Sequence, residues 1–428
     1  MTHTDYTKKI LNIKDDNIYF YENCLEIKRV KGIETKIFHG YLTYTPEYCL
    51  KCGCVNEGFD DIIKWNYKRN CKIKITKACG YNTILLLDKQ RFYCKHCYKT
   101  FTATTDVVDF HKQISNDTKL SIILDLMNKD SEKNISKRNN VSTNSTNRIL
   151  DEISKDKLVK NNGHLPISLG IDEFMATKDT IGKMAFIIVD QNKHNIFDIN
   201  NSRKSKDIYN YFFRYPKFER NKVKFITLDL YKPYYKLMHK LFPKAILIPD
   251  RFHIVIQFRN ALDKTRINLC KKSNPNYKKL KKYWKLILKN EDYLDDKNKS
   301  YSSNFRKEVT EKYIVEYLIN SNEILYATYN YYQGLLKFLK TRDKEKFLSI
   351  IHNINNNVSD YAKKANRTLL DNEKYIVNSF DYDLSNGITK GTNNIIKQIK
   401  HNACGYRKFS HLKARVMLVK GLYNPIKA

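Results

Sequence analysis

Apolar and polar residues alternate along much of the segment from residue 165 to 265, and this spacing predicts strands. The first strand runs through Ile167, Leu169 and Ile171 and ends at Asp172. Four further strands and one helix are predicted, in order, at Met184–Val189, Asn195–Ile199, Lys206–Tyr215 (the helix), Val223–Asp229 and Ala245–Asp250. Together they make a mixed sheet of the α/β class in which acidic residues end neighbouring strands.

Residues 113–160 have the spacing of short helices with polar caps. A helical pattern begins at Leu120–Met127, and Ser131 is a good N-cap for a second helix that reaches Arg138. After a turn, Thr143–Leu150 is predicted as a third helix, whose open face carries side chains suited to base edges or phosphates, namely Asn144, Ser145, Asn147 and Arg148. This pattern predicts a DNA-binding helix-turn-helix. A helical hairpin that only links two domains is the alternative.

A lysine-rich helical sequence follows over residues 266–385, and an amphipathic segment occupies 386–428. The stretch Lys271–Lys289 holds eight lysines, interleaved with aromatic residues. Most such runs are solvated faces, but in a basic chain they also suit contacts with phosphates. The candidate DNA contacts in these two segments are Lys278, Lys281, Lys282, Lys397, Lys400 and Arg407.

Cysteines are concentrated near the N-terminus, where eight of the ten fall within residues 1–112. The pairs Cys49 and Cys52, and Cys94 and Cys97, have the CxxC spacing of two turns that close a four-sulfur zinc site. Such a zinc ion is structural, because four protein ligands leave no open position. The long segment between the pairs needs strands of its own, predicted at Lys72–Thr76 and Asn82–Leu87. The alternatives are unrelated buried cysteines, a redox pair, or ligation by His96.

Charge adds a polyanionic partner to this picture. The 428 residues carry a formal net charge of +33, which favours nucleic acid first and an anionic membrane surface second. An AT-rich genome would also raise the content of Lys, Asn, Ile and Tyr. We see no apolar signal segment and no run of about 18 apolar residues, so we expect a cytoplasmic protein with reduced thiols.

The two acids that end predicted strands suggest a catalytic site. If Asp172 and Asp229 end adjacent strands, their carboxylates converge, and converging oxygen ligands bind Mg²⁺ or Mn²⁺. Two such ions clamp the attacking and leaving oxygens of an in-line phosphoryl displacement. Either aspartate taken alone is more simply a loop cap or a salt-bridge partner. The pair predicts a nuclease or strand-transfer site.

Several segments carry a resemblance to a known family. They are RFYCKHCYKTFT at 91–102, GIDEF at 170–174, TLDLYKPYY at 227–235, PDRFH at 249–253, and SNGITKGTNNIIKQIK with GYRKFSHLKARV from Ser385 onward. In these segments the chain resembles the bacterial insertion-sequence transposases of the ISL-three family. The resemblance implies a zinc ribbon, a helix-turn-helix and a ribonuclease H-like core with an Asp-Asp-Glu triad, interrupted by a helical insertion.

The resemblance also implies domain boundaries. They are 1–112 with the zinc ribbon at about 45–105, 113–160 for the helix-turn-helix, 165–265 for the first part of the catalytic core, 266–385 for the helical insertion, and 386–428 for the C-terminal helices of the core.

Carried over residue by residue, the family triad is incomplete in this chain. Asp172 matches the first acid and Asp229 the second, while Lys390 stands where the family has Glu. An ammonium there repels a cation, by about 4 kcal/mol for unit charges ~4 Å apart at an effective dielectric near 20. Asp250 and His253 match a D-x-x-H motif, in which the histidine would orient a phosphate or, alternatively, only begin a helix.

The resemblance implies a transposase that binds terminal inverted repeats of double-stranded DNA and cuts and joins strands with Mg²⁺ or Mn²⁺, besides its structural zinc. It would act at the bacterial nucleoid as a homo-oligomer on paired DNA ends. Because of Lys390, we expect strand cleavage to be severely reduced while DNA binding remains. The alternative is a catalytically dead relic that binds DNA. A zinc-ribbon protein acting on RNA explains the charge but not the paired acids.

Overall fold

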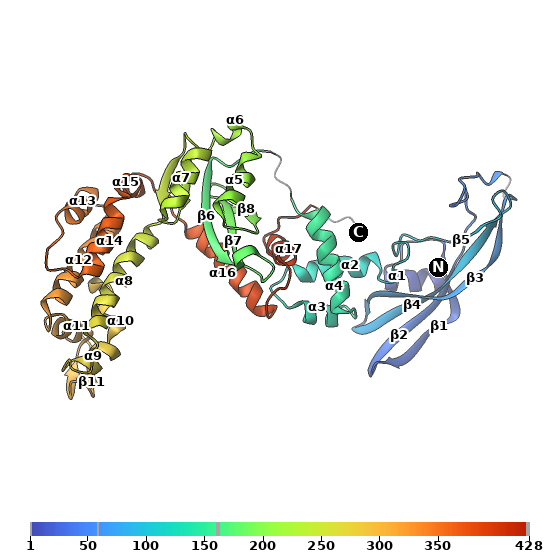
Figure 1. The fold of residues 1–428 in the computed structure, drawn as a ribbon. Coiled ribbons are helices and arrows are strands. Elements are labelled where there is room, and N and C mark those ends of the chain that lie inside the picture. The colour runs from blue at the N-terminus through green and yellow to red at the C-terminus, as the bar shows by residue number, and fades with distance from the viewer. Residues whose placement is uncertain (1, 58–59, 160–162, 425–428) are drawn as a thin grey trace. The chain divides into compact units, whose positions relative to one another are not determined.

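The chain folds into two compact units, each described here by itself (Figure 1). The computed structural model describes residues 2–57, 60–159 and 163–424. The first unit comprises Met1–Lys160, Thr177–Asp179 and Asn394–Ala428, and the second comprises Asn161–Ala176 and Thr180–Asn393. Among the described residues, no helix combines the length and apolar character that crossing a membrane requires.

A twisted sheet forms the N-terminal part of the first unit. Helix α1 (His3–Leu11) precedes the strands β1 (Ile18–Val30), β2 (Ile33–Leu42), β3 (Ile62–Ala78), β4 (Tyr81–Cys94) and β5 (Thr100–Thr102). The sheet order is β1-β2-β4-β3, and β5 pairs with β4. Ile73 and Leu85, from the two segments predicted as strands, are buried in its core. Those predictions are confirmed, but each segment is only part of a much longer strand.

Short helices make up most of the rest of the first unit. They are α2 (Asn116–Leu126), α3 (Glu132–Arg138), α4 (Thr143–Glu152), the π-helical turn η2 (Ile153–Lys157) and α17 (Phe409–Val419). Ser115, Ser131 and Ser142 each accept a hydrogen bond from a backbone amide in the first turn, which explains where α2, α3 and α4 begin. The three predicted helices are therefore present.

Helix α17 is tied to these helices by a buried arginine. Arg415 is fully buried, and its guanidinium donates to the carbonyl oxygens of Leu126 and Asp130. Its Nε donates to the hydroxyl of Tyr406 at 3.1 Å, and that hydroxyl donates to Glu132 Oε1 at 2.6 Å. The buried cation thus has both hydrogen-bond partners and a carboxylate nearby, as a buried charge requires.

A five-stranded mixed sheet is the centre of the second unit. Its strands are β6 (Ser168–Met175), β7 (Met184–Asp190), β8 (Asn195–Asn200), β9 (Phe225–Leu228) and β10 (Ile246–Pro249), in the order β10-β9-β6-β7-β8. Strands β6, β9 and β10 are parallel, whereas β7 is antiparallel to both β6 and β8. All five predicted strands and the predicted helix are present, the helix as α5 (Ser205–Phe213). The predicted end of the first strand at Asp172 is wrong, because β6 stays paired with β7 as far as Met175.

Helices cover this sheet because its strands are apolar on both faces. The interior of β7, from Ala185 to Val189, is buried throughout. Residues of α5 and α7 (Lys232–Leu241), such as Phe212 and Met238, pack in the same hydrophobic cluster as the sheet residues. The short helices η3 (Ile181–Lys183) and α6 (Lys217–Arg220) complete this region.

A helical segment with its own core follows β10. It contains α8 (Arg251–Leu269), α9 (Tyr277–Lys282), α10 (Trp284–Ile287), η4 (Glu291–Tyr293), the hairpin β11 (Ser300–Ser302) and β12 (Lys307–Val309), α11 (Glu311–Ile319), α12 (Glu323–Thr341), α13 (Lys344–His352), α14 (Asp360–Leu370) and α15 (Glu373–Asp381). These elements share one hydrophobic cluster, which includes Phe258, Leu335 and Leu369. Helix α16 (Gly387–Asn402) comes next along the chain.

Candidate active site and metal-binding clusters

The register of two parallel strands aligns two acids. In the β6–β9 pair, Ser168 is opposite Phe225 and Gly170 is opposite Thr227. Two residues further along each strand come Asp172 and Asp229. Because side chains two residues apart point to the same face of a strand, this register brings both carboxylates to the same end and the same face of the sheet.

Asp172 is held by two hydrogen bonds in a largely buried position. Its Oδ1 accepts from the backbone amide of Glu173 at 2.7 Å, and its Oδ2 accepts from Asn393 Nδ2 on α16 at 2.7 Å. Burial and, second to it, the nearby negative charge of Asp229 together raise the pKa of Asp172 to about 6. The two carboxylates therefore repel each other, and a bound cation would relieve that repulsion.

Asp229, Asp250 and His253 form a cluster of potential metal ligands. One ligand atom from each lies within 4.8 Å of the others. Asp250 caps α8 by accepting a hydrogen bond from the amide of Phe252 at 3.2 Å, so the first turn of that helix carries His253 toward the acids. His253 Nε2 lies 3.0 Å from Asp229 Oδ1, and this contact raises the pKa of the imidazole. The cluster offers oxygen and nitrogen donors together.

Lys390 lies inside this group of acids. Its Nζ is 2.6 Å from Asp250 Oδ2, and it lies 3.8 Å from the centre of the Phe252 ring. The Asp250 side chain is only 5% exposed, whereas that of Lys390 is 36% exposed. The ammonium is therefore held between a buried carboxylate and an aromatic face, where it neutralises one of the negative charges.

A buried polar network fixes α16 against the sheet. Asn386 Nδ2 donates to the carbonyl oxygen of Ile171 at 3.2 Å, and Thr227 Oγ1 donates to Asn386 Oδ1 at 2.5 Å. Gln191 Nε2 donates to Thr227 Oγ1 at 2.5 Å. A Cβ on Gly170 would lie only 2.7 Å from Thr389 Oγ1, so this glycine permits the helix to approach the strand. The network sets the position of Lys390, one turn after Asn386.

Sequence reasoning missed the roles of the two asparagines on α16. Asn386 bonds to the strand beside the first acid, and Asn393 bonds to that acid itself. Both fall within the segment that carries the resemblance, SNGITKGTNN, so the signal was present there. Thr227 likewise begins the segment TLDLYKPYY, whereas Gln191 lies outside all of these segments and gave no signal.

The four predicted cysteines lie together. Cys49 Sγ is 3.8 Å from Cys97 Sγ, and Cys52 Sγ is 3.8 Å from Cys94 Sγ. All four sulfur atoms lie within 4.8 Å of one another, so they can hold a metal ion. Sulfur atoms at ~2.3 Å around a tetrahedral Zn²⁺ would be separated by about 3.8 Å, which matches these distances. Cys54, Cys71, Cys79 and His96 are not part of the group.

The predicted DNA-contacting residues of α4 lie on its open side. Asn144 and Arg148 are exposed, whereas Ser145 and Asn147 are half-buried. Ser145 is engaged locally, because its hydroxyl lies 2.9 Å from that of the cap residue Ser142. The opposite side of the helix is buried through Ile149 and its neighbours.

The predicted basic contacts belong to separate segments. The three lysines on α9 are all exposed, namely Lys278, Lys281 and Lys282. Lys281 lies over the ring of Tyr277, and Lys282 lies over the ring of Tyr283. On α16 and after it, Lys397 and Arg407 are exposed and Lys400 is half-buried.

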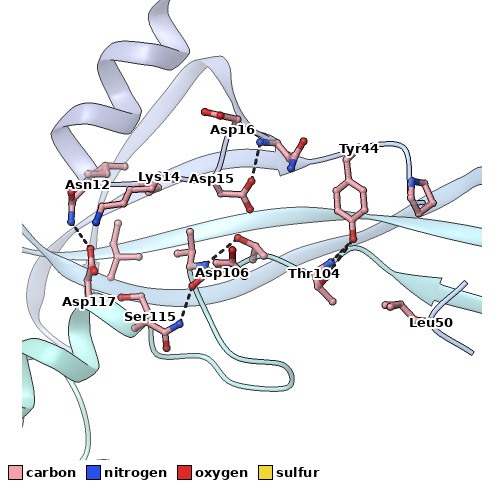
Figure 2. Close-up of a pocket in the computed structure, with 18 of the residues that line it drawn as sticks. Asn12, Lys14, Asp15, Asp16, Tyr44, Leu50, Thr104, Asp106, Ser115 and Asp117 are labelled. Atoms are coloured by element: carbon pink, nitrogen blue, oxygen red, sulfur yellow. Dashed lines mark hydrogen bonds between the residues drawn. The ribbon is translucent and has the colours of Figure 1, made fainter. Parts of the chain in front are cut away.

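A pocket of about 700 Å³ in the first unit contains none of the predicted site residues (Figure 2). Its polar lining is hydrogen-bonded, for example from Asn12 Nδ2 to Asp117 Oδ2 at 2.7 Å and from the amide of Thr104 to the hydroxyl of Tyr44 at 3.0 Å. Its charged lining residues are Lys14 and five acids, Asp15, Asp16, Glu47, Asp106 and Asp117. This excess of negative charge would repel DNA phosphates, so the pocket is not a nucleic-acid interface.

Comparisons with known proteins show which family this chain resembles. A protein of Lactococcus lactis subsp. lactis, named an ATP-dependent protease, is 32% identical to this chain over 127 residues, or 29% of the chain. The match spans 41% of the length of that relative. A family model described as a transposase matches residues 169–416, more than half of the chain, including Asp172, Asp229 and Lys390. The chain therefore belongs to the ISL-three family of transposases, a family of enzymes that cut and transfer DNA.

Proposed function

We propose that the chain is an insertion-sequence transposase that binds terminal inverted repeats and carries out metal-dependent strand cleavage and transfer in a ribonuclease H-like core. The observation that carries this proposal is the β6–β9 register, which brings Asp172, inside β6, to the level of Asp229, the residue that follows β9. The strand order β10-β9-β6-β7-β8, with β7 antiparallel to its neighbours, supports a core of that type.

The donor set fits a divalent cation. Asp229 and Asp250 offer the hard oxygen ligands that Mg²⁺ and Mn²⁺ prefer, and His253 adds one imidazole nitrogen. Asn393 Oδ1 is buried next to Asp172 and accepts no hydrogen bond from the described residues, so a bound ion or its water would satisfy it. When bound, such an ion supplies charge stabilisation to an in-line phosphoryl displacement.

The protein's own residues would position the DNA strand. We propose that Asp172 and Asp229 hold the cation with the imidazole of His253 beside them, and that this cluster orients a phosphate of the strand. Lys390 limits this arrangement, because its ammonium already neutralises Asp250. We therefore propose that strand cleavage is severely reduced, and that a DNA-binding relic without catalysis is the second candidate function.

DNA binding would rest on the first unit and on basic helices. We propose that the four CxxC cysteines hold structural zinc and that Asn144, Ser145, Asn147 and Arg148 of α4 read the DNA ends. The helix-turn-helix geometry is supported by the serine-capped α3 and α4, which pack together through Ser136 and Thr146. The basic groups on α9, α16 and the segment after it would add phosphate contacts. A homo-oligomer on paired ends is part of the proposal.

A cleavage assay tests the enzymatic part. Purified, zinc-loaded protein is mixed with DNA carrying the ends of its own element and with Mg²⁺ or Mn²⁺, and nicks are mapped on both strands. We expect little cleavage by the natural chain and at least tenfold more by Lys390→Glu. Adding Asp172→Asn to Lys390→Glu should abolish that gain. Cleavage by the natural chain at the rate of Lys390→Glu would refute the role of Lys390, and cleavage that survives Asp172→Asn would refute the site.

A further inference from the structure

An exposed tryptophan lies on the N-terminal sheet, near the cysteine cluster. Trp65 on β3 is 58% exposed, and its ring packs against that of Tyr93 on β4, with centroids 5.4 Å apart. On β4, Phe92 is fully buried and packs against Phe101. Since alternate residues of a strand point to opposite faces, Tyr93 and its alternate neighbour Arg91 point away from that core.

Cationic and polar side chains surround the aromatic pair. The β4–β5 register places Arg91 opposite Thr102 and Tyr93 opposite Thr100, so these side chains share the open face. Arg91 Nη2 donates to Thr100 Oγ1 at 2.8 Å, which orients its guanidinium. Three lysines on β3 and on the turn after β4 are also exposed, namely Lys68, Lys95 and Lys99. We call Trp65, Tyr93, Arg91 and Thr100 the Trp65 surface.

The exposed indole and the nearby cations determine which class of ligand this surface can bind. The indole packs against Tyr93 and leaves the rest of its surface open on a face that also carries the oriented guanidinium of Arg91, an arrangement that can stack on a planar, apolar ring. In a chain with a net charge of +33, that ligand is an anion with an apolar, planar part. Duplex DNA presents phosphates but keeps the faces of its bases covered by their stacked neighbours. An unpaired strand presents both phosphates and free base faces.

We propose that the Trp65 surface binds unpaired DNA, with one base stacked on Trp65 and the adjoining phosphate contacting Arg91. The proposal rests on the proposed function in one respect, that DNA is the partner. It adds a second mode of binding to that of α4, one that requires an opened or single-stranded segment. The surface lies directly before the turn Cys94–Cys97, so a metal held by the cysteines would stiffen the end of β4 that carries Tyr93.

Tryptophan fluorescence tests the proposal in the full chain. The chain has two tryptophans, so Trp284→Phe leaves Trp65 as the only reporter. Titration with an oligothymidylate should quench that fluorescence to saturation, because a stacked thymine quenches indole. In the natural background, Trp65→Ala should weaken oligothymidylate binding about tenfold, the typical effect of removing one stacking partner. It should change the affinity for duplex end DNA by less than twofold.

Controls separate stacking from folding and from general exposure. Trp65→Leu keeps an apolar side chain without an aromatic face, so it should lose oligothymidylate affinity as Trp65→Ala does, whereas Trp65→Phe should retain most of it. Tyr6→Ala removes an aromatic side chain of equal exposure, 58%, from α1 and should have no effect. Each variant must keep the metal content and circular dichroism of the natural chain.

Three results would count against the proposal. Unchanged oligothymidylate affinity in Trp65→Ala, with duplex binding intact, would overturn the Trp65 surface alone. An equal loss for duplex and single strand would overturn the assignment to unpaired DNA. Failure of the natural chain to bind either DNA would overturn the proposed function, and this inference with it.

Discussion

Replacement of Lys390 should raise the affinity of the second unit for Mn²⁺. The ammonium lies 2.6 Å from Asp250 Oδ2, and the potential ligand atoms of Asp229, Asp250 and His253 lie within 4.8 Å of one another. A cation bound by these three residues would therefore lie about 4 Å from the ammonium, a distance at which like charges interact strongly. We expect the affinity order Lys390→Glu, then Lys390→Ala, then the natural chain.

The magnitude follows from the dielectric around Lys390. Two unit charges ~4 Å apart repel by about 4 kcal/mol at an effective dielectric near 20 and by about 1 kcal/mol in water. The Lys390 side chain is 36% exposed, so solvent screens it and the ammonium can swing away from the cation. We therefore take a repulsion near the lower end of this range, about 1.4 kcal/mol. Removing it in Lys390→Ala corresponds to a tenfold gain in affinity for Mn²⁺. Lys390→Glu adds a ligand and should gain more.

These affinities are measured by titrating DNA-free protein with Mn²⁺ at constant temperature. Electron paramagnetic resonance reports the concentration of free ion at each step. Lys397→Glu is the matched control, because it makes the same charge change on an exposed position of the same helix. It should change the affinity by less than twofold. Equal affinities of the natural chain and Lys390→Glu would show that the ammonium does not compete with the cation, and the argument from the ion pair would fail.

Three further outcomes are expected. The pKa of Asp172 is raised to about 6 from 3.8, so without magnesium or manganese the folded state loses stability as the pH rises between these values. Asp172→Asn should remove that loss, so in urea unfolding it should add about 2 kcal/mol to the unfolding free energy at pH 7 and almost nothing below pH 4. An equal change in the unfolding free energy at both pH values would refute this prediction. Stoichiometric zinc should be released from the natural chain by a mercurial reagent and should be missing from Cys52→Ser, with loss of sheet circular dichroism; full zinc content in Cys52→Ser would exclude this cluster. Arg415→Leu should lower the unfolding free energy of the first unit by about 3 kcal/mol, because buried carbonyls and Glu132 lose their partner, and a change below 1 kcal/mol would contradict that account.

Local signals in the sequence carried the prediction of most elements near the site. The alternation over Ile167–Ile171 and the serine caps at Ser131 and Ser142 act within a few residues, so a pattern reveals them. Asp250 caps α8 for the same reason and was visible as the residue that ends a strand. The CxxC spacing likewise fixes two cysteines of a cluster at a time.

Such local patterns cannot predict contacts between residues that are far apart in the sequence. Arg415 looked like one more basic residue in a basic segment, yet it is fully buried against carbonyls nearly three hundred residues earlier in the chain. Strands β3 and β4 contain bulges, which interrupt the alternation and hid their true lengths. Asn386 and Asn393 acquire their roles only when α16 packs on β6, and no local spacing encodes that contact.

The charge balance at the site explains why the change at Lys390 matters more than the loss of one ligand. Asp172, Asp229 and Asp250 bring three negative charges when ionised, and Lys390 brings one positive charge, while an imidazole of His253 that ligates a cation is neutral. One divalent cation is enough to neutralise what remains. With Glu at position 390 the same group would carry four carboxylates, whose repulsion two divalent cations would relieve. A two-ion clamp is what in-line phosphoryl transfer uses to stabilise both the attacking and the leaving oxygen. The natural chain therefore has the charge to hold one ion, and the stoichiometry in the Mn²⁺ titration should rise from one in the natural chain to two in Lys390→Glu.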